Sequence, residues 1–174
     1  MKYLKYIIIT IIVLGLLFIV KGFITPSISY ETEIVVNKPV QESWAVMSDE
    51  SNLPKWIRGF KKVELISGTS NTLGAVSKVY IEEEGNEMIM EETIIALKEN
   101  ELMAMTFTMD FMNINYEMLF KEQGGKTVIT TKTHTTGNSM IAKSMLSFMS
   151  GSMGTQEDEN LNNLKNLIEG NSSE

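Results

Sequence analysis

The chain of 174 residues contains no cysteine and a single histidine. Without cysteine the fold cannot depend on disulfides, and neither thiolate catalysis nor a cysteine-ligated zinc is available. One histidine, His134, cannot make a common zinc site, and its strand parity with Lys132 predicts an outward position. The sequence also lacks a G-x-S-x-G elbow, a P-loop and a dinucleotide-binding fingerprint. We therefore expect neither a metal nor a cofactor.

Charge is distributed unevenly along the chain. The first 25 residues contain three lysines and no acid, so the remainder carries all 22 acidic residues against 12 basic ones, a net charge of −10. A domain this acidic is a poor partner for nucleic acid or for anionic lipid headgroups. We expect no nucleic-acid partner, and any attachment to a membrane has to come from the N-terminal segment.

Residues 7–20 form an uncharged apolar run, IIITIIVLGLLFIV, which predicts a membrane-spanning helix within 1–25. Residues 6–20 give about 22 Å of helix, and the flanking apolar residues extend it toward the roughly 30 Å of a hydrocarbon core. A cleaved signal peptide is the alternative, but no A-x-A cleavage site follows closely. The lysines before the run predict a single-pass protein with a cytoplasmic N-terminus and the domain outside the cytoplasm.

The rest of the chain predicts one α+β domain at 30–170, after a linker at 26–29 and before a tail at 171–174. Two short helices are expected after the first strand: one with Val40, Trp44 and Met47 on one face, capped by Asn37, and one with Trp56. A long helix is expected at 138–169, with Gly151 and Gly154 weakening its middle. Alternation and turn residues, including Glu84-Gly85, predict strands at 30–36, 61–67, 75–83, 86–99, 101–110, 112–122 and 124–136.

Strand parity predicts which side chains face inward. The inward faces of 101–110 and 112–120 carry methionine and aromatic residues, whereas the opposite face of 112–120 carries Asn113, Asn115 and Glu117. In 86–97 the better choice places Met88, Met90, Glu92, Ile94 and Ala96 inside, because the other parity would bury two glutamates. The thirteen methionines indicate either a soft core or a cavity with an adaptable wall.

The segment IVVNKPVQESWAVMSDESNLPKWIRGFKKVELISG, with GGKTVITTKT and LNNLKNLIE, resembles the SRPBCC superfamily, also called START-like or helix-grip, in its polyketide cyclase/dehydrase branch. The resemblance covers about residues 30–169. It implies a helix-grip fold, in which a seven-stranded curved antiparallel sheet surrounds the C-terminal helix, two short helices cover a deep apolar cavity, and Trp56 lies at the entrance. The N-terminal membrane helix is not part of the family pattern.

We therefore predict a membrane-tethered, non-catalytic protein that binds a small hydrophobic ligand or lipid. One alternative is a cyclase- or hydrolase-like enzyme that uses Glu92 and Tyr116, although no nucleophile–base pair is present. The other is a protein-interaction module with a filled core. Glu92 would have a raised pKa among methionines, unless it lies at the sheet rim or bonds to Tyr116 or Lys132. The predicted ligand-binding residues are Trp56, Met88, Met90, Glu92, Met103, Met105, Phe107, Met109, Met112, Ile114, Tyr116, Met118, Met145, Met149 and Met153.

Overall fold

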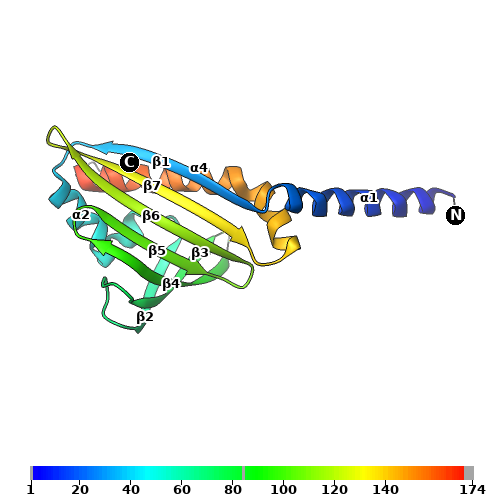
Figure 1. Ribbon diagram of the computed structural model, residues 1–174, viewed down its shortest axis with the longest axis horizontal. Helices are drawn as coiled ribbons and strands as arrows, with labels where there is room; N and C mark the ends of the chain where they lie inside the picture. Colours follow the sequence, from blue (N-terminus) through cyan, green and yellow to red (C-terminus); the bar gives the residue numbers. More distant parts are fainter. Residues whose placement is uncertain (1, 84, 171–174) are drawn as a thin grey trace.

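Seven antiparallel strands form one curved sheet around a long helix (Figure 1). The computed structural model describes residues 2–83 and 85–170, so the predicted tail at 171–174 and Glu84 of the predicted turn lie outside this part. The strands follow the order β1-β7-β6-β5-β4-β3-β2, and β2 to β7 form a meander. They are β1 (Ser27–Val36), β2 (Phe60–Ser67), β3 (Val76–Glu83), β4 (Asn86–Lys98), β5 (Leu102–Thr108), β6 (Met112–Gln123) and β7 (Lys126–Gly137).

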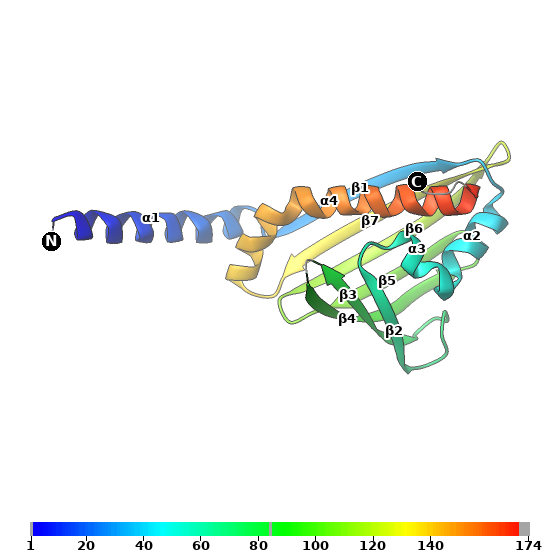
Figure 2. The same cartoon turned by 180° about the vertical axis from the view of Figure 1, so that it is seen from behind.

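The helices occupy one face and one end of this sheet (Figure 2). The long helix α4 (Met140–Glu169) runs along the sheet, while α2 (Val40–Ser48), the 3-10 turn η1 (Glu50–Asn52) and α3 (Leu53–Trp56) follow one another at the end away from α1 (Lys2–Ile24). The predicted α+β helix-grip architecture, with its two short helices and terminal helix, is confirmed. The two tryptophans lie on α2 and α3, as predicted.

The first helix, α1, extends away from the domain (Figure 1). Its segment Tyr3–Ile24 is long and apolar enough to cross a membrane, and it suits a signal sequence equally well by the same criteria. Twenty-two residues at 1.5 Å each give about 33 Å, which matches a hydrocarbon core of about 30 Å. β1 begins at Ser27 and pairs there with Thr136 of β7, so most of the segment expected as a linker belongs to the strand.

The predicted inward faces of β5 and β6 are confirmed by burial: Met103, Met118 and Phe120 are buried, and the opposite face of β6 is largely exposed. The prediction for β4 is wrong beyond Ile94. A bulge shifts the register there, so that Leu97 pairs with Met103 and packs into the core, whereas Ala96 pairs with Ala104. A bulge inserts one unpaired residue and therefore reverses the alternation that follows it.

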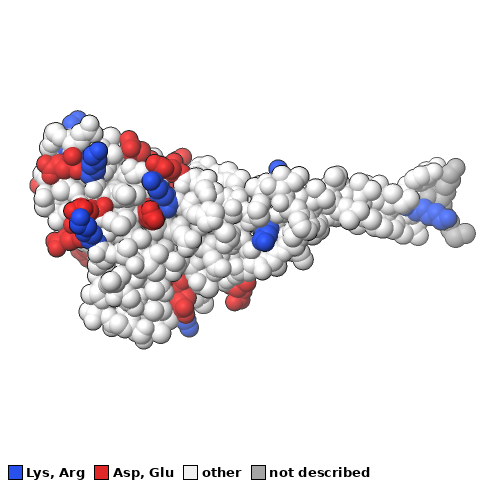
Figure 3. Space-filling model, viewed as in Figure 1, with Lys and Arg blue, Asp and Glu red and all other residues white. Residues whose placement is uncertain are grey.

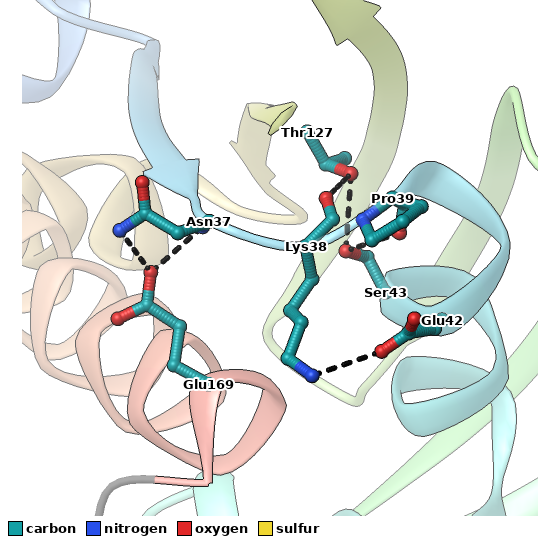
Figure 4. Close-up of polar contacts among 7 residues, drawn as sticks. All are labelled: Asn37, Lys38, Pro39, Glu42, Ser43, Thr127 and Glu169. Carbon is teal, nitrogen blue, oxygen red and sulfur yellow. Dashed lines mark hydrogen bonds and ion pairs between the residues drawn. The ribbon is translucent and has the colours of Figure 1, made fainter. Parts of the chain in front are cut away.

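The start of α2 differs from the prediction, because Asn37 does not cap it. The N-cap is Pro39, and the Asn37 backbone N–H and side-chain amide both donate to Glu169 Oε1, at 2.8 and 2.9 Å (Figure 4). The first turn is held instead by Ser43, whose Oγ lies 3.1 Å from both the Pro39 carbonyl oxygen and Thr127 Oγ1. The Asn37–Glu169 hydrogen bonds tie the end of β1 to the end of α4, and the Ser43–Thr127 contact ties α2 to β7.

α4 is continuous through both predicted weak points, Gly151 and Gly154. The Ser139 hydroxyl caps its start by accepting from the Ala142 N–H at 3.1 Å, and Gly170 ends it with φ of 73°. The buried core forms two apolar clusters. The larger, at the α2 end, includes Val36, Trp44, Met47, Trp56, Met103, Met118, Phe120, Ile129, Leu161, Leu164 and Ile168, and the smaller consists of Met109, Met112 and Leu146.

Candidate ligand-binding cavity

A cavity of about 590 Å³ lies inside the domain, and residues of both apolar clusters contribute to its wall. Its volume falls within the roughly 300–1,000 Å³ of small-molecule sites, which are concave and mostly apolar with a few placed polar groups. β3 to β6, α3 and the middle of α4 supply most of the lining. The protein's own described side chains leave this space open, which argues against the predicted alternative of a filled core.

Fourteen of the fifteen predicted ligand-binding residues line this cavity. The inward strand faces supply most of them, because successive inward positions of β4, β5 and β6 pair across the sheet: Met105 stands opposite Tyr116, and Phe107 opposite Ile114. The lining residues that were predicted are Trp56, Met88, Met90, Glu92, Met103, Met105, Phe107, Met109, Met112, Ile114, Tyr116, Met118, Met149 and Met153.

Met145 is the exception, since it lies outside the lining and 46% of its surface is exposed. The reason is helix geometry. Four residues advance an α-helix by slightly more than one turn, so the row Met145, Met149 and Met153 rotates by about 40° at each step. Met149 is still partly exposed, and Met153 packs against the smaller cluster. The row therefore turns gradually from solvent toward the sheet.

A buried polar pair joins α4 to the sheet within the cavity wall. The Tyr116 hydroxyl of β6 donates to Glu157 Oε1 of α4 at 2.9 Å. Burial raises the pKa of Tyr116 well above its usual value, and the Glu157 charge raises it further. Burial also raises the pKa of Glu157, against the opposing effect of nearby hydroxyls. Burial likewise raises the pKa of Tyr30 of β1, so both phenols stay protonated donors near one carboxyl.

Glu92 forms a second polar point in the wall. In the sheet register, Glu92 of β4 stands opposite Ser77 of β3 and Phe107 of β5. Burial, followed by the negative charge of Glu50, raises the pKa of Glu92 to about 7. No described residue gives Glu92 a hydrogen bond or an ion pair, and Tyr116, one of its two expected partners, bonds to Glu157 instead. The other expected partner, Lys132, is exposed.

Glu92 and Tyr116, the two residues of the predicted enzymatic alternative, are not brought together. β5 separates their strands, which places the two backbones about 10 Å apart at normal strand spacing. They are also out of line, because Glu92 aligns through Phe107 with Ile114 rather than with Tyr116. The geometry therefore keeps the Glu92 carboxyl apart from the Tyr116–Glu157 pair, and Glu92 and Tyr116 form no nucleophile–base pair.

Sequence reasoning missed Glu157 and Tyr30, although each had a usable signal. Glu157 stands four residues after Met153 and four before the buried Leu161, so it lies on an apolar helical row. Tyr30 shares strand parity with the buried Ile28 and Val36, which places it on the inner face of β1. An acid in an apolar row and a tyrosine on an inner strand face together indicate a buried polar contact.

Several buried polar atoms near the cavity have no hydrogen-bond partner among the described residues. They are Trp56 Nε1 and the hydroxyl oxygens of Thr131, Thr133 and Thr135. Trp56 and Thr133 line the cavity directly. Thr133 lies close to the Tyr30 hydroxyl, so Trp56 Nε1 is the group that offers an unused donor to whatever occupies the space, because an unpaired buried donor is costly. The predicted outward position of His134 is confirmed, and its Nδ1 lies 2.8 Å from Ser29 Oγ.

Polar contacts connect the segments at the rim of the cavity. The Ser70 hydroxyl donates to Glu50, and the Asn71 amide donates to the Ser48 carbonyl oxygen at 3.0 Å, so the β2–β3 loop contacts the turn after α2. On the other side, the Arg58 N–H donates to Asn160 Oδ1 of α4 at 2.9 Å. These contacts hold the two short helices against the sheet and α4.

A known family model matches most of the chain. The family model described as polyketide cyclase / dehydrase and lipid transport matches residues 27–169, which is nearly all of the chain after α1. No curated protein sequence matches the chain.

Solved structures with low sequence identity share the fold. The Zhui aromatase/cyclase from Streptomyces sp. R1128 superposes with a TM-score of 0.69 at 12% identity, over 82% of this chain and 94% of that one. The protein of unknown function SA2116 from Staphylococcus aureus gives 0.67 at 15%, over 83% and 94%. Ara h 8.0201 gives 0.59 at 17%, over 83% and 96%. At these identities the likeness concerns the fold alone.

Proposed function

The chain belongs to the polyketide cyclase/dehydrase and lipid transport family, and from that premise we propose that it binds a small hydrophobic molecule or lipid while tethered to a membrane by α1. The observation that carries this proposal is the cavity of about 590 Å³, whose wall is mostly apolar and holds the buried Tyr116–Glu157 pair. Methionines supply much of that wall, and their flexible side chains adapt to ligands of varied shape.

The polar groups favour a ligand with an apolar body and at least one hydrogen-bonding group. The Trp56 Nε1 can donate to a carbonyl or hydroxyl oxygen, and Glu157 can accept from a hydroxyl. A ligand without such a group would leave this buried donor unpaired, which costs about 1–3 kcal/mol. A lipid or a polycyclic ketone has this mixed chemistry.

The tether is supported by the way in which α1 meets the domain. A Cβ added at Gly22 would lie 2.4 Å from Ser144 Oγ, so α1 and α4 pack as closely as glycine permits. A signal peptide that is cleaved off makes no lasting contact with the mature domain, so close packing between α1 and α4 favours an uncleaved helix. In this proposal the N-terminus is cytoplasmic and the domain lies outside the cytoplasm, because lysines precede the apolar run.

Native mass spectrometry of the full chain, released from detergent, tests the binding proposal. We expect a bound lipid-sized species, and we expect Ile114→Trp to lose it because the larger side chain fills the cavity. Asn115→Trp is the matched control, since Asn115 is the next residue of β6 and faces outward. If both variants keep the bound species equally well, the cavity is not the binding site. Thermal unfolding of both variants verifies that they fold.

Catalysis is the second candidate, and the pKa of about 7 at Glu92 is the observation that favours it. A carboxyl with such a pKa can accept or donate a proton near neutral pH. If the compound recovered from the cavity is turned over by the wild type and not by Glu92→Gln, the enzymatic function is supported. Equal turnover by both proteins would exclude Glu92 as the acid or base.

A further inference from the structure

We propose that the first turns of α4, residues 140–153, lie in the interface of the bilayer that α1 spans, so that lipid borders the cavity wall at Met149. This inference rests on the tether of the proposed function and adds a second membrane contact, made by the domain itself. It concerns the apolar patch of α4, which we define as Ile141, Met145, Phe148 and Met149.

Contacts between α1 and α4 set the position of this segment. The rings of Phe18 and Phe148 stack at a centroid distance of 5.8 Å with an interplanar angle of 7°. Gly22, four residues after Phe18, meets the backbone and hydroxyl of Ser144, four residues before Phe148, so the two segments run antiparallel. The two helices are therefore in register over at least one turn, and α4 begins beside α1 rather than beyond its end.

The contact between Phe18 and Phe148 determines how deep the start of α4 lies in the bilayer. Phe18 precedes Ile24, the last residue of α1, by six positions, which is about 9 Å along the helix. Since the 22-residue span is only slightly longer than a hydrocarbon core, Ile24 lies near the edge of the core when α1 spans it. Phe148 then lies at the depth of Phe18, below the headgroups. Interfacial helices are buried by about 5–10 Å, which is the same range.

The surface of the segment suits that depth. The patch residues are 60%, 46%, 67% and 37% exposed in the order given above, and they follow one another at helical spacing. Lys143 is the sole charged residue between positions 138 and 156, and its side chain is long enough to reach the headgroups. Soluble surfaces rarely carry an apolar patch of this kind without a partner.

The distribution of charge agrees with a membrane beside this patch. Acidic and basic side chains gather over the end of the domain away from α1, whereas the surface next to α1 carries few of them (Figure 3). The net charge of −10 in the domain would oppose close approach to anionic headgroups, but on the face shown in Figure 3 most acidic side chains lie toward the end away from α1.

The patch is continuous with the cavity. Met149 belongs to the patch and also lines the cavity, and Ser152 and Met153 of the next turn line it as well. Lipid in contact with Met149 would therefore border the cavity wall itself. The ligand would pass between bilayer and cavity along α4, without an aqueous step.

Depth measurements on the full chain in phosphatidylcholine vesicles test this inference. Because the chain has no cysteine, one spin label can be placed without background at Met145→Cys, in the patch, and at Leu14→Cys, in the middle of α1. Asn162→Cys is the matched control, an exposed position of α4 outside the patch. Power-saturation electron paramagnetic resonance with oxygen and a nickel chelate then reports the depth of each label.

We expect label 14 deep in the bilayer, label 145 about 5–10 Å below the headgroups and label 162 in water. If label 14 is in lipid and label 145 is in water, the inference is overturned and the tether stands. If label 145 is shielded from both reagents, a protein surface covers the patch, and the inference is again overturned. A label 14 in water refutes the tether and this inference together.

Discussion

Replacing Glu92 with glutamine should change the dependence of stability on pH. Burial raises the pKa of Glu92 from the ordinary 4.5 to about 7 in the folded protein, whereas in the unfolded chain the carboxyl is exposed to water. Below the unfolded pKa both states hold the proton, and the carboxyl destabilises neither. Between the two values folded Glu92 stays protonated while unfolded Glu92 ionises, so stability falls as pH rises.

The size of this effect follows from the two pKa values. Each pH unit between them is worth about 1.4 kcal/mol, so the wild type loses about 3 kcal/mol of its free energy of unfolding by about pH 8. Glutamine has nearly the same shape and does not titrate. Glu92→Gln should therefore match the wild type at about pH 4.5 and exceed it by about 3 kcal/mol at about pH 8.

Urea unfolding of the full chain in a non-ionic detergent measures this difference, with the fluorescence of Trp44 and Trp56 as the signal. Glu91→Gln is the control, because Glu91 precedes Glu92 on the same strand and is exposed. It should change stability by less than about 0.5 kcal/mol at either pH, as expected for a surface substitution. A constant difference between Glu92→Gln and the wild type across this pH range would refute the burial of an ionisable Glu92.

Three further substitutions test other contacts. Tyr116→Phe leaves the buried Glu157 carboxyl without its 2.9 Å hydrogen bond and should cost about 1–3 kcal/mol in urea unfolding. Leu161→Ala empties a fully buried position of the larger cluster and should cost about 2–5 kcal/mol. Gly22→Leu places a side chain against Ser144, so disulfide cross-linking between cysteines introduced at positions 18 and 148 should decrease.

Each of these has a matched control elsewhere in the chain. Tyr80→Phe removes a hydroxyl that bonds Glu64 at the surface, and Leu65→Ala truncates a leucine that is 48% exposed. Gly15→Leu enlarges a residue of α1 with no neighbour within 4 Å of its added Cβ. We expect small effects from all three. If a control matches its test variant, the contact assigned to that variant does not carry the effect.

The inward faces of the middle strands could be predicted from the sequence because alternation is a local property. In β6 the row from Met112 to Phe120 differs so clearly from Asn113, Asn115 and Glu117 that one parity is favoured. Alternation predicted the wrong inward side chains of β4 after Ile94, because the bulge near Ile95 inserts one residue and reverses which face the later side chains occupy. Nothing in the composition of that strand marks the insertion.

Contacts between distant segments were the other source of error. Asn37 has the chemistry of a helix cap, but Glu169 approaches it from the far end of the chain and takes both of its donors. The Tyr116–Glu157 pair likewise depends on where α4 crosses the sheet. Helical spacing indicated that Glu157 was unusual, but its partner could be identified only from the packed structure.

The two apolar clusters have a consequence for how the protein responds to heat. Between them α4 and the sheet enclose space instead of side chains, and under the proposed function another molecule would fill part of it. An occupant that binds only the folded chain adds about 2.7 kcal/mol when present at a hundredfold excess over its dissociation constant. The melting temperature would then rise with the concentration of that molecule in the surrounding membrane, so the thermal stability of the protein would depend on the composition of the membrane.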